Sequence, residues 1–202
     1  MVIDKSKIEE RQYNFDINAS VNEERGHVLE GLAIVFNKAT DIGPFDEIID
    51  PGALDNTDMR DVRFLVNHDT TQLPLARSRN NNENSTMQLT VGADGLHTRI
   101  DLDTENNTRA AELYSAVERG DVTGMSYMYL VDGDEWEGLG TDHPTRHIRS
   151  ISKVFEVSAV TFPAYQDTDI QARSLDSAMA TLDSALSEVR AAERETKLKS
   201  LD

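Results

Sequence analysis

The feature that most constrains the fold is a series of short apolar or alternating segments, each ended by turn-forming residues, between residues 28 and 162. In Leu96–Leu102 apolar and polar residues alternate strictly after a Gly/Asp turn, which is typical of a hairpin strand with one buried face. The other segments of strand character are Val28–Phe36, Phe45–Ile49, Val62–Val66, Met87–Val91, Val122–Val131 and Val154–Phe162, the last ending at Pro163-Ala164. The chain should therefore be mainly β.

Two segments have helical spacing instead. Between Thr104, which we expect to cap a helix, and about Arg119, apolar residues recur at helical intervals until Gly120 ends the pattern. Beyond Arg173 a short heptad pattern consists of Leu175, Met179, Leu182, Leu186 and Val189. This tail is predicted either to pack on the body as an amphipathic helix or to form a coiled coil. The expected fold class is mainly β with a few helices (α+β), as a barrel or sandwich.

Charge and composition exclude several classes of function. With 202 residues the chain is long enough for one folded body with appendages. The net charge of −17 argues against a nucleic-acid partner, because phosphate binding needs clustered Lys and Arg. Cysteine is absent, which excludes disulfides, thiolate metal sites and a cysteine nucleophile. No apolar run has the length of a signal peptide or a membrane span, so we expect an intracellular protein without membrane contact.

Ser126 is a candidate nucleophile. It follows Gly124-Met125 in a segment of strand character, where glycine lets the backbone approach a substrate closely. A hydroxyl nucleophile needs a neighbouring base and a third group that orients the base. Many ordinary strands contain Gly-x-Ser, and the second glycine of an α/β-hydrolase elbow is missing here. The residues alone therefore leave Ser126 as either a nucleophile or an ordinary strand serine.

His68 is the candidate base. It comes directly after the apolar segment Val62–Val66 and is flanked by Asn67 and Asp69, so its ring should emerge at a rim that reaches solvent. Histidine titrates near neutral pH, which suits general-base catalysis. The alternative is a surface histidine at the end of a strand.

Glu156 interrupts the otherwise apolar segment Ile151–Phe162. A carboxylate at a buried position needs a partner, and orienting a histidine is one such pairing. The alternative is an outward-facing acid on an edge strand.

His143 and His147 lie four residues apart around Pro144, a spacing that resembles a pair of metal ligands. The helix and the acid of a zinc protease motif are missing. We interpret the pair as part of a solvated loop within the Gly- and Asp-rich segment that begins at Gly133, and we expect no metal and no cofactor. A metal hydrolase is the weakest alternative function.

Four segments together resemble the HK97-type phage prohead maturation protease family, whose fold is related to that of the herpesvirus assembly proteases. They occur in order between about Gly31 and Arg173, and four modest motifs at compatible separations make a chance similarity improbable. The resemblance implies a herpesvirus-protease-like β barrel at 27–173, after an N-terminal extension with the first strand at 1–26 and before a helical tail at 174–202. The segments are FDEIIDPGAL at 45–54, FLVNHD at 64–69, GMSY at 124–127 and FEVSAVTFPAY at 155–165.

The resemblance also implies a catalytic set. The family's histidine corresponds to His68 and its serine to Ser126, with Tyr127 standing where the family usually has Phe. Herpesvirus relatives use a second histidine as the third member, but this chain has none in the Glu156 segment, so the orienting role passes to Glu156 by inference. Asp142 or His143 would compete if their loop folded back.

The implied function is that of a serine endopeptidase that matures phage capsids. Its substrates would be the scaffold segment of the major capsid protein and the protease itself, cleaved inside the assembling prohead in the host cytoplasm. Relatives also suggest a homodimer, and the tail would suit co-assembly with helical scaffold. One alternative is a non-enzymatic assembly or scaffold protein that keeps the fold. Another is a β-rich binding module that uses the hairpin around Gly92–Gly95 as an edge, for which Ser126→Ala would have no effect.

Overall fold

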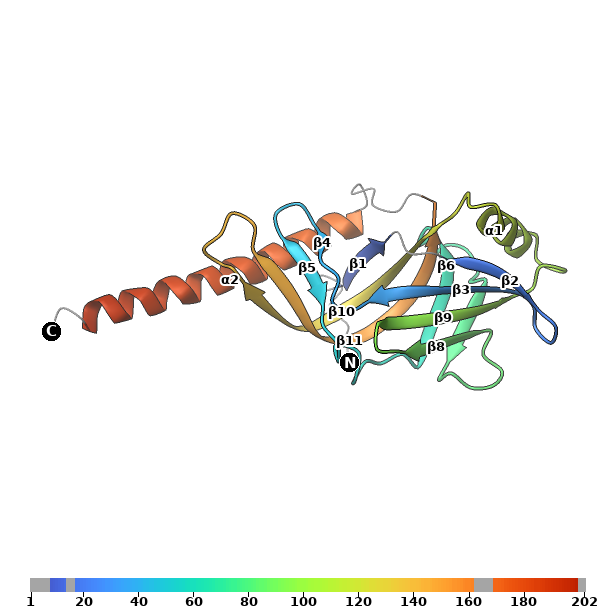
Figure 1. The fold of residues 1–202 in the computed structure, drawn as a ribbon, viewed down its shortest axis with the longest axis horizontal. Coiled ribbons are helices and arrows are strands. Elements are labelled where there is room, and N and C mark those ends of the chain that lie inside the picture. Colours follow the sequence, from blue (N-terminus) through green and yellow to red (C-terminus); the bar gives the residue numbers. More distant parts are fainter. Residues whose placement is uncertain (1–7, 14–16, 162–168, 200–202) are drawn as a thin grey trace.

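The predicted strands are present in the computed structural model, which describes residues 8–13, 17–161 and 169–199 (Figure 1). The expected class, mainly β with a few helices, is confirmed. The strands are β1 (Ile8–Tyr13), β2 (Asn18–Asn22), β3 (Gly26–Val35), β4 (Thr40–Asp41), β5 (Asp46–Ile49), β6 (Asp61–Val66), β7 (Ala76–Arg79), β8 (Met87–Val91), β9 (Gly95–Leu102), β10 (Gly124–Glu137) and β11 (Thr145–Val160). The helices are α1 (Thr108–Glu118) and α2 (Asp169–Lys199).

The strands form two sheets. The larger sheet has the order β1-β10-β11-β5-β4, and β6 pairs with both β11 and β7. The smaller sheet has the order β2-β3-β9-β8. The long strand β11 pairs in parallel with β5 through its first residues and with β6 through its last, and pairs antiparallel with β10 on its other side. β11 therefore connects the region around β5 with the end of β6, where His68 follows.

The core is formed by apolar side chains from both sheets and from α1, because alternation along each strand turns one set of side chains inward. In β9, Leu96, Thr98, Ile100 and Leu102 are buried, as the alternating sequence predicts. Fully buried aromatic and aliphatic side chains around this core include Leu29, Ile34, Phe64, Met87, Tyr127, Tyr129, Val154 and Val157.

The connection between β10 and β11 is shorter than the sequence indicated. The Gly- and Asp-rich segment was expected to be a loop from Gly133, but β10 continues to Glu137, which pairs with Thr145 at the start of β11. Trp136 packs edge-on against Phe45, with ring centroids 4.9 Å apart. This contact with another segment explains why local glycine content did not end the strand.

The helix α1 also begins later than expected. Its N-cap is Asn107, whose side chain accepts hydrogen bonds from the backbone N–H groups of Arg109 and Ala110. Thr104, expected as the cap, instead places its hydroxyl 2.6 Å from Nδ1 of His27. The predicted strand end at Pro163-Ala164 lies outside the described residues.

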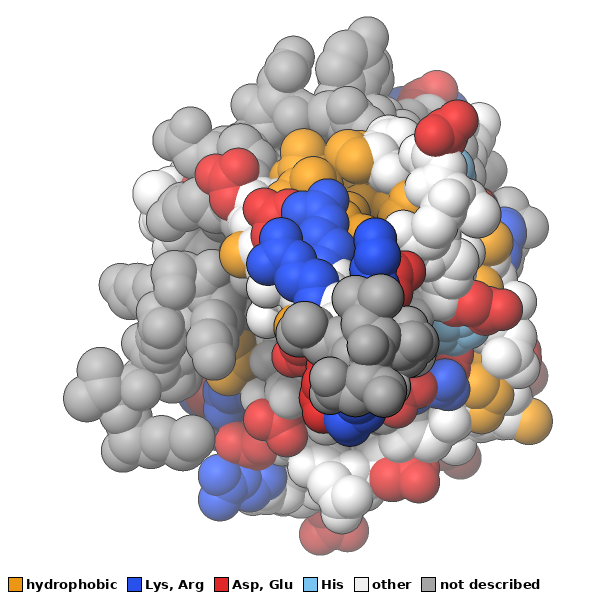
Figure 2. Space-filling model, turned by 90° about the vertical axis from the view of Figure 1, so that its left-hand side faces the viewer, with side chains coloured by type: hydrophobic (Ala, Val, Ile, Leu, Met, Phe, Trp, Pro, Cys, Tyr) orange, Lys and Arg blue, Asp and Glu red, His pale blue; other side chains and the backbone are white. Residues whose placement is uncertain are grey.

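The helical tail is present as α2, which packs through its first half on the body and projects away from it (Figure 1). Ser174, Ala178 and Leu182 are buried at four-residue spacing, whereas Val189 is 41% exposed. Figure 2 shows the molecule from the side on which α2 ends. Acidic and basic side chains are interspersed over the face that is seen there. Neither helix in the described part of the chain is both long and apolar enough to span a membrane. The coiled coil and the division into three parts stay predictions.

Candidate active site

Three neighbouring strands bring the predicted residues together. Ser126 in β10 lies opposite Ser158 in β11, and Glu156 lies two residues before Ser158 on the same face of that strand. On the other side of β11, β6 runs parallel to it and ends at Val66. His68 follows two residues later, so its ring reaches the face that carries Ser126 and Glu156.

The three side chains form a continuous chain of contacts. Nε2 of His68 lies 2.6 Å from Oγ of Ser126. Nδ1 of His68 lies 2.5 Å from Oε1 of Glu156. A hydroxyl next to one ring nitrogen and a carboxylate on the other is the arrangement of a serine nucleophile, its base and the group that orients the base.

A left-handed turn presents the His68 ring. Asn67 and His68 have φ values of 51° and 55°, a conformation that costs an L-residue roughly 1–2 kcal/mol and that asparagine tolerates best. The turn is held by the N–H of Asn67, which donates to the carbonyl of Ala159 at 2.9 Å. The side-chain oxygen of Asn67 accepts from the N–H of Thr161 at 3.0 Å. The segment Asn67-His68 is thus fixed to the end of β11.

Ser158 is a further residue of the site, which the sequence did not single out. Its hydroxyl donates to Oε2 of Glu156 at 2.6 Å and accepts from the backbone N–H of His68 at 3.1 Å. Ser158 is fully buried, so these two contacts take the place of water. Ser158 could have been predicted from its position two residues after Glu156, because this spacing on a strand places both side chains on one face.

The electrostatics of the site favour a charged imidazole. Burial acts to lower the pKa of His68, but the hydrogen bond and charge of Glu156, together with the charge of Glu10, outweigh it and raise the pKa above its ordinary value. Oε1 of Glu10 lies 3.2 Å from Nε2 of His68. The ring nitrogen that faces Ser126 is therefore also the one that faces Glu10.

The strand β1 covers the site. Its residue Gln12 pairs with Ser126, and the carbonyl oxygen of Arg11 lies 2.8 Å from Oγ of Ser126. Ser126 is fully buried, and the His68 side chain is only 8% exposed. The expectation of a solvent-reaching rim was wrong for this reason. The sequence also did not indicate that Glu10 and Arg11 enter the site.

The competing residues lie elsewhere. Asp142 is exposed between β10 and β11, and Nε2 of His143 lies 3.3 Å from Asp46. His147 was expected in a solvated loop, but it is a residue of β11 and its Nδ1 lies 2.9 Å from Asp50. Its backbone pairs with Ile48 of β5 and Glu135 of β10, which places it in the sheet.

The described part of the chain contains one cluster that could hold a metal ion, formed by Asp41, Asp46 and His143. Asp41 is exposed, and His147 is not among the three. The pair His143 and His147 therefore does not form a common site.

The model of a known family matches residues 14–181, and its description is caudovirus prohead serine protease. The chain belongs to this family. The resemblance seen in the four sequence segments is thereby confirmed. The matched segment includes His68, Ser126 and Glu156.

The proteins that are similar to the chain include two phage proteases. The prohead protease of Enterobacteria phage HK97 is 33% identical over 153 residues, which cover 74% of this chain and 61% of that protein. The chain thus spans less than two thirds of the length of this relative. The solved structure of the capsid assembly protease of bacteriophage T4 aligns with a TM-score of 0.45 and 11% identity, over 78% of this chain and 98% of that one.

Proposed function

We propose that the chain is a serine endopeptidase that cleaves the scaffold segment of a phage major capsid protein, and itself, inside the assembling prohead. The observation that carries the proposal is the contact chain from Oγ of Ser126 through His68 to Glu156, with distances of 2.6 and 2.5 Å. Membership of a protease family supports the same chemistry.

In the proposed reaction, neutral His68 takes the proton of Ser126 as Oγ attacks a peptide carbonyl. Glu156 holds Nδ1–H and stabilises the imidazolium that forms. The imidazolium then gives its proton to the leaving amine, and water hydrolyses the acyl-enzyme in a second cycle of the same transfers. Ser158 keeps the carboxylate of Glu156 pointed at the ring through its 2.6 Å hydrogen bond.

The test is co-expression of the chain, as wild type and as Ser126→Ala, with the major capsid protein of the same phage. Intact-mass analysis of both proteins follows. Ser126→Ala removes only the hydroxyl at a buried position, so the variant should fold and still join the prohead. We expect a shortened capsid protein with the wild type and a full-length one with the variant.

Ser150→Ala is the matched control, because Ser150 lies in β11, the strand paired with β10, and has its hydroxyl 3.4 Å from Asp132, away from the site. It should cleave like the wild type. Unshortened capsid protein with the wild type would contradict the proposal and favour a non-enzymatic scaffold protein that keeps the protease fold.

A further inference from the structure

The strand β1 occupies the place that an extended substrate would need. It pairs antiparallel with β10, the strand that carries Ser126, and it forms the edge of the larger sheet. Proteins commonly bind extended peptides by adding a strand to a sheet edge. Because Ser126 is fully buried beneath β1, another polypeptide chain can reach it only after β1 has left.

The backbone of β1 presents one particular peptide bond to the nucleophile. The hydroxyl of Ser126 donates a hydrogen bond of 2.8 Å to the carbonyl oxygen of Arg11, and the bond that follows this carbonyl joins Arg11 to Gln12. On the other side of Oγ, Nε2 of His68 lies at 2.6 Å. The nucleophile thus lies between its base and the carbonyl group of Arg11.

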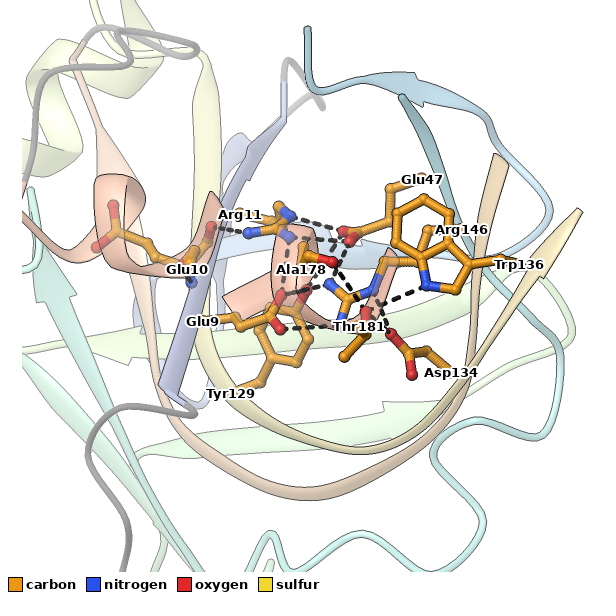
Figure 3. A network of polar contacts seen from close by, with 11 residues as sticks. Glu9, Glu10, Arg11, Glu47, Tyr129, Asp134, Trp136, Arg146, Ala178 and Thr181 are labelled. Carbon is orange, nitrogen blue, oxygen red and sulfur yellow. Dashed lines mark hydrogen bonds and ion pairs between the residues drawn. The ribbon is translucent and has the colours of Figure 1, made fainter. Parts of the chain in front are cut away.

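The side chain of Arg11 enters an acidic subsite (Figure 3). Its Nε and Nη2 lie 2.6 and 2.8 Å from the two carboxylate oxygens of Glu47 in β5. Glu47 is fully buried, and Arg11 and Arg146 lower its pKa against the opposing effect of burial. A two-point contact of this kind suits the planar fork of a guanidinium group.

A second subsite receives Glu9, two residues before Arg11 and on the same face of β1 (Figure 3). Nη1 and Nη2 of Arg146 in β11 lie 2.9 and 3.0 Å from the carboxylate oxygens of Glu9. Arg146 also contacts Glu47 at 3.0 Å and Asp134 at 2.6 Å. Arg146 and Glu47 do not belong to β1, and their contact with each other does not depend on it. Both subsites should therefore remain after β1 has left.

We propose that β1 is a self-substrate bound in the substrate groove, with Arg11–Gln12 as the bond that is cut. Glu47 selects a basic residue on the amino side of the cut, and Arg146 selects an acidic residue two positions earlier. The preferred substrate is therefore an extended acidic-x-basic segment. This inference rests on the proposed serine protease function and specifies which peptide bonds the protease prefers.

The reaction balances with water as the only co-reactant. The hydroxyl of Ser126 first turns its proton from the carbonyl oxygen of Arg11 to Nε2 of His68, which accepts it as Oγ bonds to the carbonyl carbon of Arg11. The bond from that carbon to the nitrogen of Gln12 then breaks, and His68 passes the proton to this nitrogen. Water then replaces Oγ, leaving a carboxylate on Arg11 and a free amine on Gln12. The released strand uncovers the groove for other substrates.

The first experiment follows the purified full chain over time by intact mass, as wild type, Ser126→Ala and Arg11→Gln. We expect the wild type to convert to a product that begins at Gln12, and Ser126→Ala to remain intact. In Arg11→Gln, conversion at this bond should fall by roughly tenfold or more, because a charge-assisted contact with Glu47 is lost.

The second experiment exposes the full chain to a library of peptides with defined ends and maps every Ser126-dependent cut. Wild type should cut after Arg or Lys, with Asp or Glu enriched two residues earlier. Glu47→Gln should lose the preference for a basic residue. Glu135→Gln, at a surface position of β10 paired with Arg149, should keep it. Arg11→Gln should cut all peptides more slowly, because β1 stays longer over Ser126, but with the same preference for Arg or Lys. If Glu47→Gln fails to fold, the preference of the wild type alone still tests the inference.

The outcomes separate the two proposals. Ser126-dependent cuts without a basic preference, or a self-cleavage site other than Arg11–Gln12, would overturn this inference and leave the protease function standing. An absence of any Ser126-dependent cut, in the peptides, in the capsid protein and in the chain itself, would overturn both.

Discussion

Ser158 shows how a single hydroxyl can control the geometry of the catalytic set. It is fully buried and connects the carboxylate of Glu156 with the backbone of His68. In Ser158→Ala the second carboxylate oxygen loses its donor, which costs about 1–3 kcal/mol and should lower kcat by roughly 10- to 100-fold with little change in KM. Peptide cleavage kinetics would measure this, with Ser150→Ala as the control. A change confined to thermal stability would show that Ser158 has only a structural role.

Glu156 sets the pH range in which His68 can act as a base. His68 must be neutral to accept a proton, and its raised pKa means that activity is lost as pH falls through a value above the ordinary histidine range. Glu156→Gln removes the charge that stabilises the imidazolium. We therefore expect the acid limb of the profile of kcat/KM to move to lower pH, while kcat falls by roughly 10⁴-fold. An unchanged acid limb would mean that another group controls it.

At the scale of elements, the helix α2 is held on the body by a small polar contact set. Nε1 of Trp136 donates to Oγ1 of Thr181 at 3.1 Å, and Oγ1 of Thr181 donates to Asp134 at 2.9 Å. Thr181→Val keeps the shape but leaves the indole N–H without its acceptor, which should cost about 1–2 kcal/mol and lower Tm by several degrees.

Thr196→Val is the matched control for that change. The Thr196 hydroxyl donates within the helix, to the carbonyl of Ala192 at 2.9 Å, in the exposed half of α2. Its effect on Tm should be within the error of a thermal melt followed by circular dichroism. Equal effects of Thr181→Val and Thr196→Val would show that the contact to Trp136 does not hold the helix.

The strands differ in how well the sequence predicts them. Strands such as β6 and β9 were predictable because their burial follows from their own apolar pattern. β1 has the sequence Ile-Glu-Glu-Arg-Gln-Tyr, in which nothing apolar alternates. Its residues Glu9 and Arg11 are buried because they find partners on β11 and β5, which lie far away along the chain. A strand stabilised by long-range ion pairs leaves no local periodicity to detect.

At the scale of the whole molecule, the site also combines parts that the sequence predicts with parts that depend on long-range packing. His68, Ser126 and Glu156 could be selected because residue type, strand position and family resemblance agreed, and the structure places them in contact. Their catalytic roles stay a prediction. The sequence could not predict that β1 lies over these residues, because this position depends on how β1, β10 and α2 pack together. Ser174 of α2, for example, accepts a hydrogen bond from the N–H of Glu10 at 3.0 Å.

The net charge of the whole chain leads to a last prediction. With 37 acidic and 20 basic residues, the folded protein gathers excess negative charge into a small volume. Raising salt from about 0.01 to about 0.1 M shortens the Debye length from roughly 30 to roughly 10 Å, which screens this repulsion. We expect Tm to rise with salt in thermal melts.

Buried ion pairs should not share this dependence on salt. Arg146 is 1% exposed, and Arg146→Met would leave Glu9 and Glu47 with less compensation, at a cost of about 3–5 kcal/mol. Glu9 is 1% exposed and Glu47 is fully buried, so salt should screen their pairs with Arg146 much less than it screens surface charges. The difference in stability between Arg146→Met and the wild type should therefore be nearly equal at both salt concentrations. A wild-type Tm that falls with salt would mean instead that exposed pairs such as Arg60 and Asp58 outweigh the general repulsion.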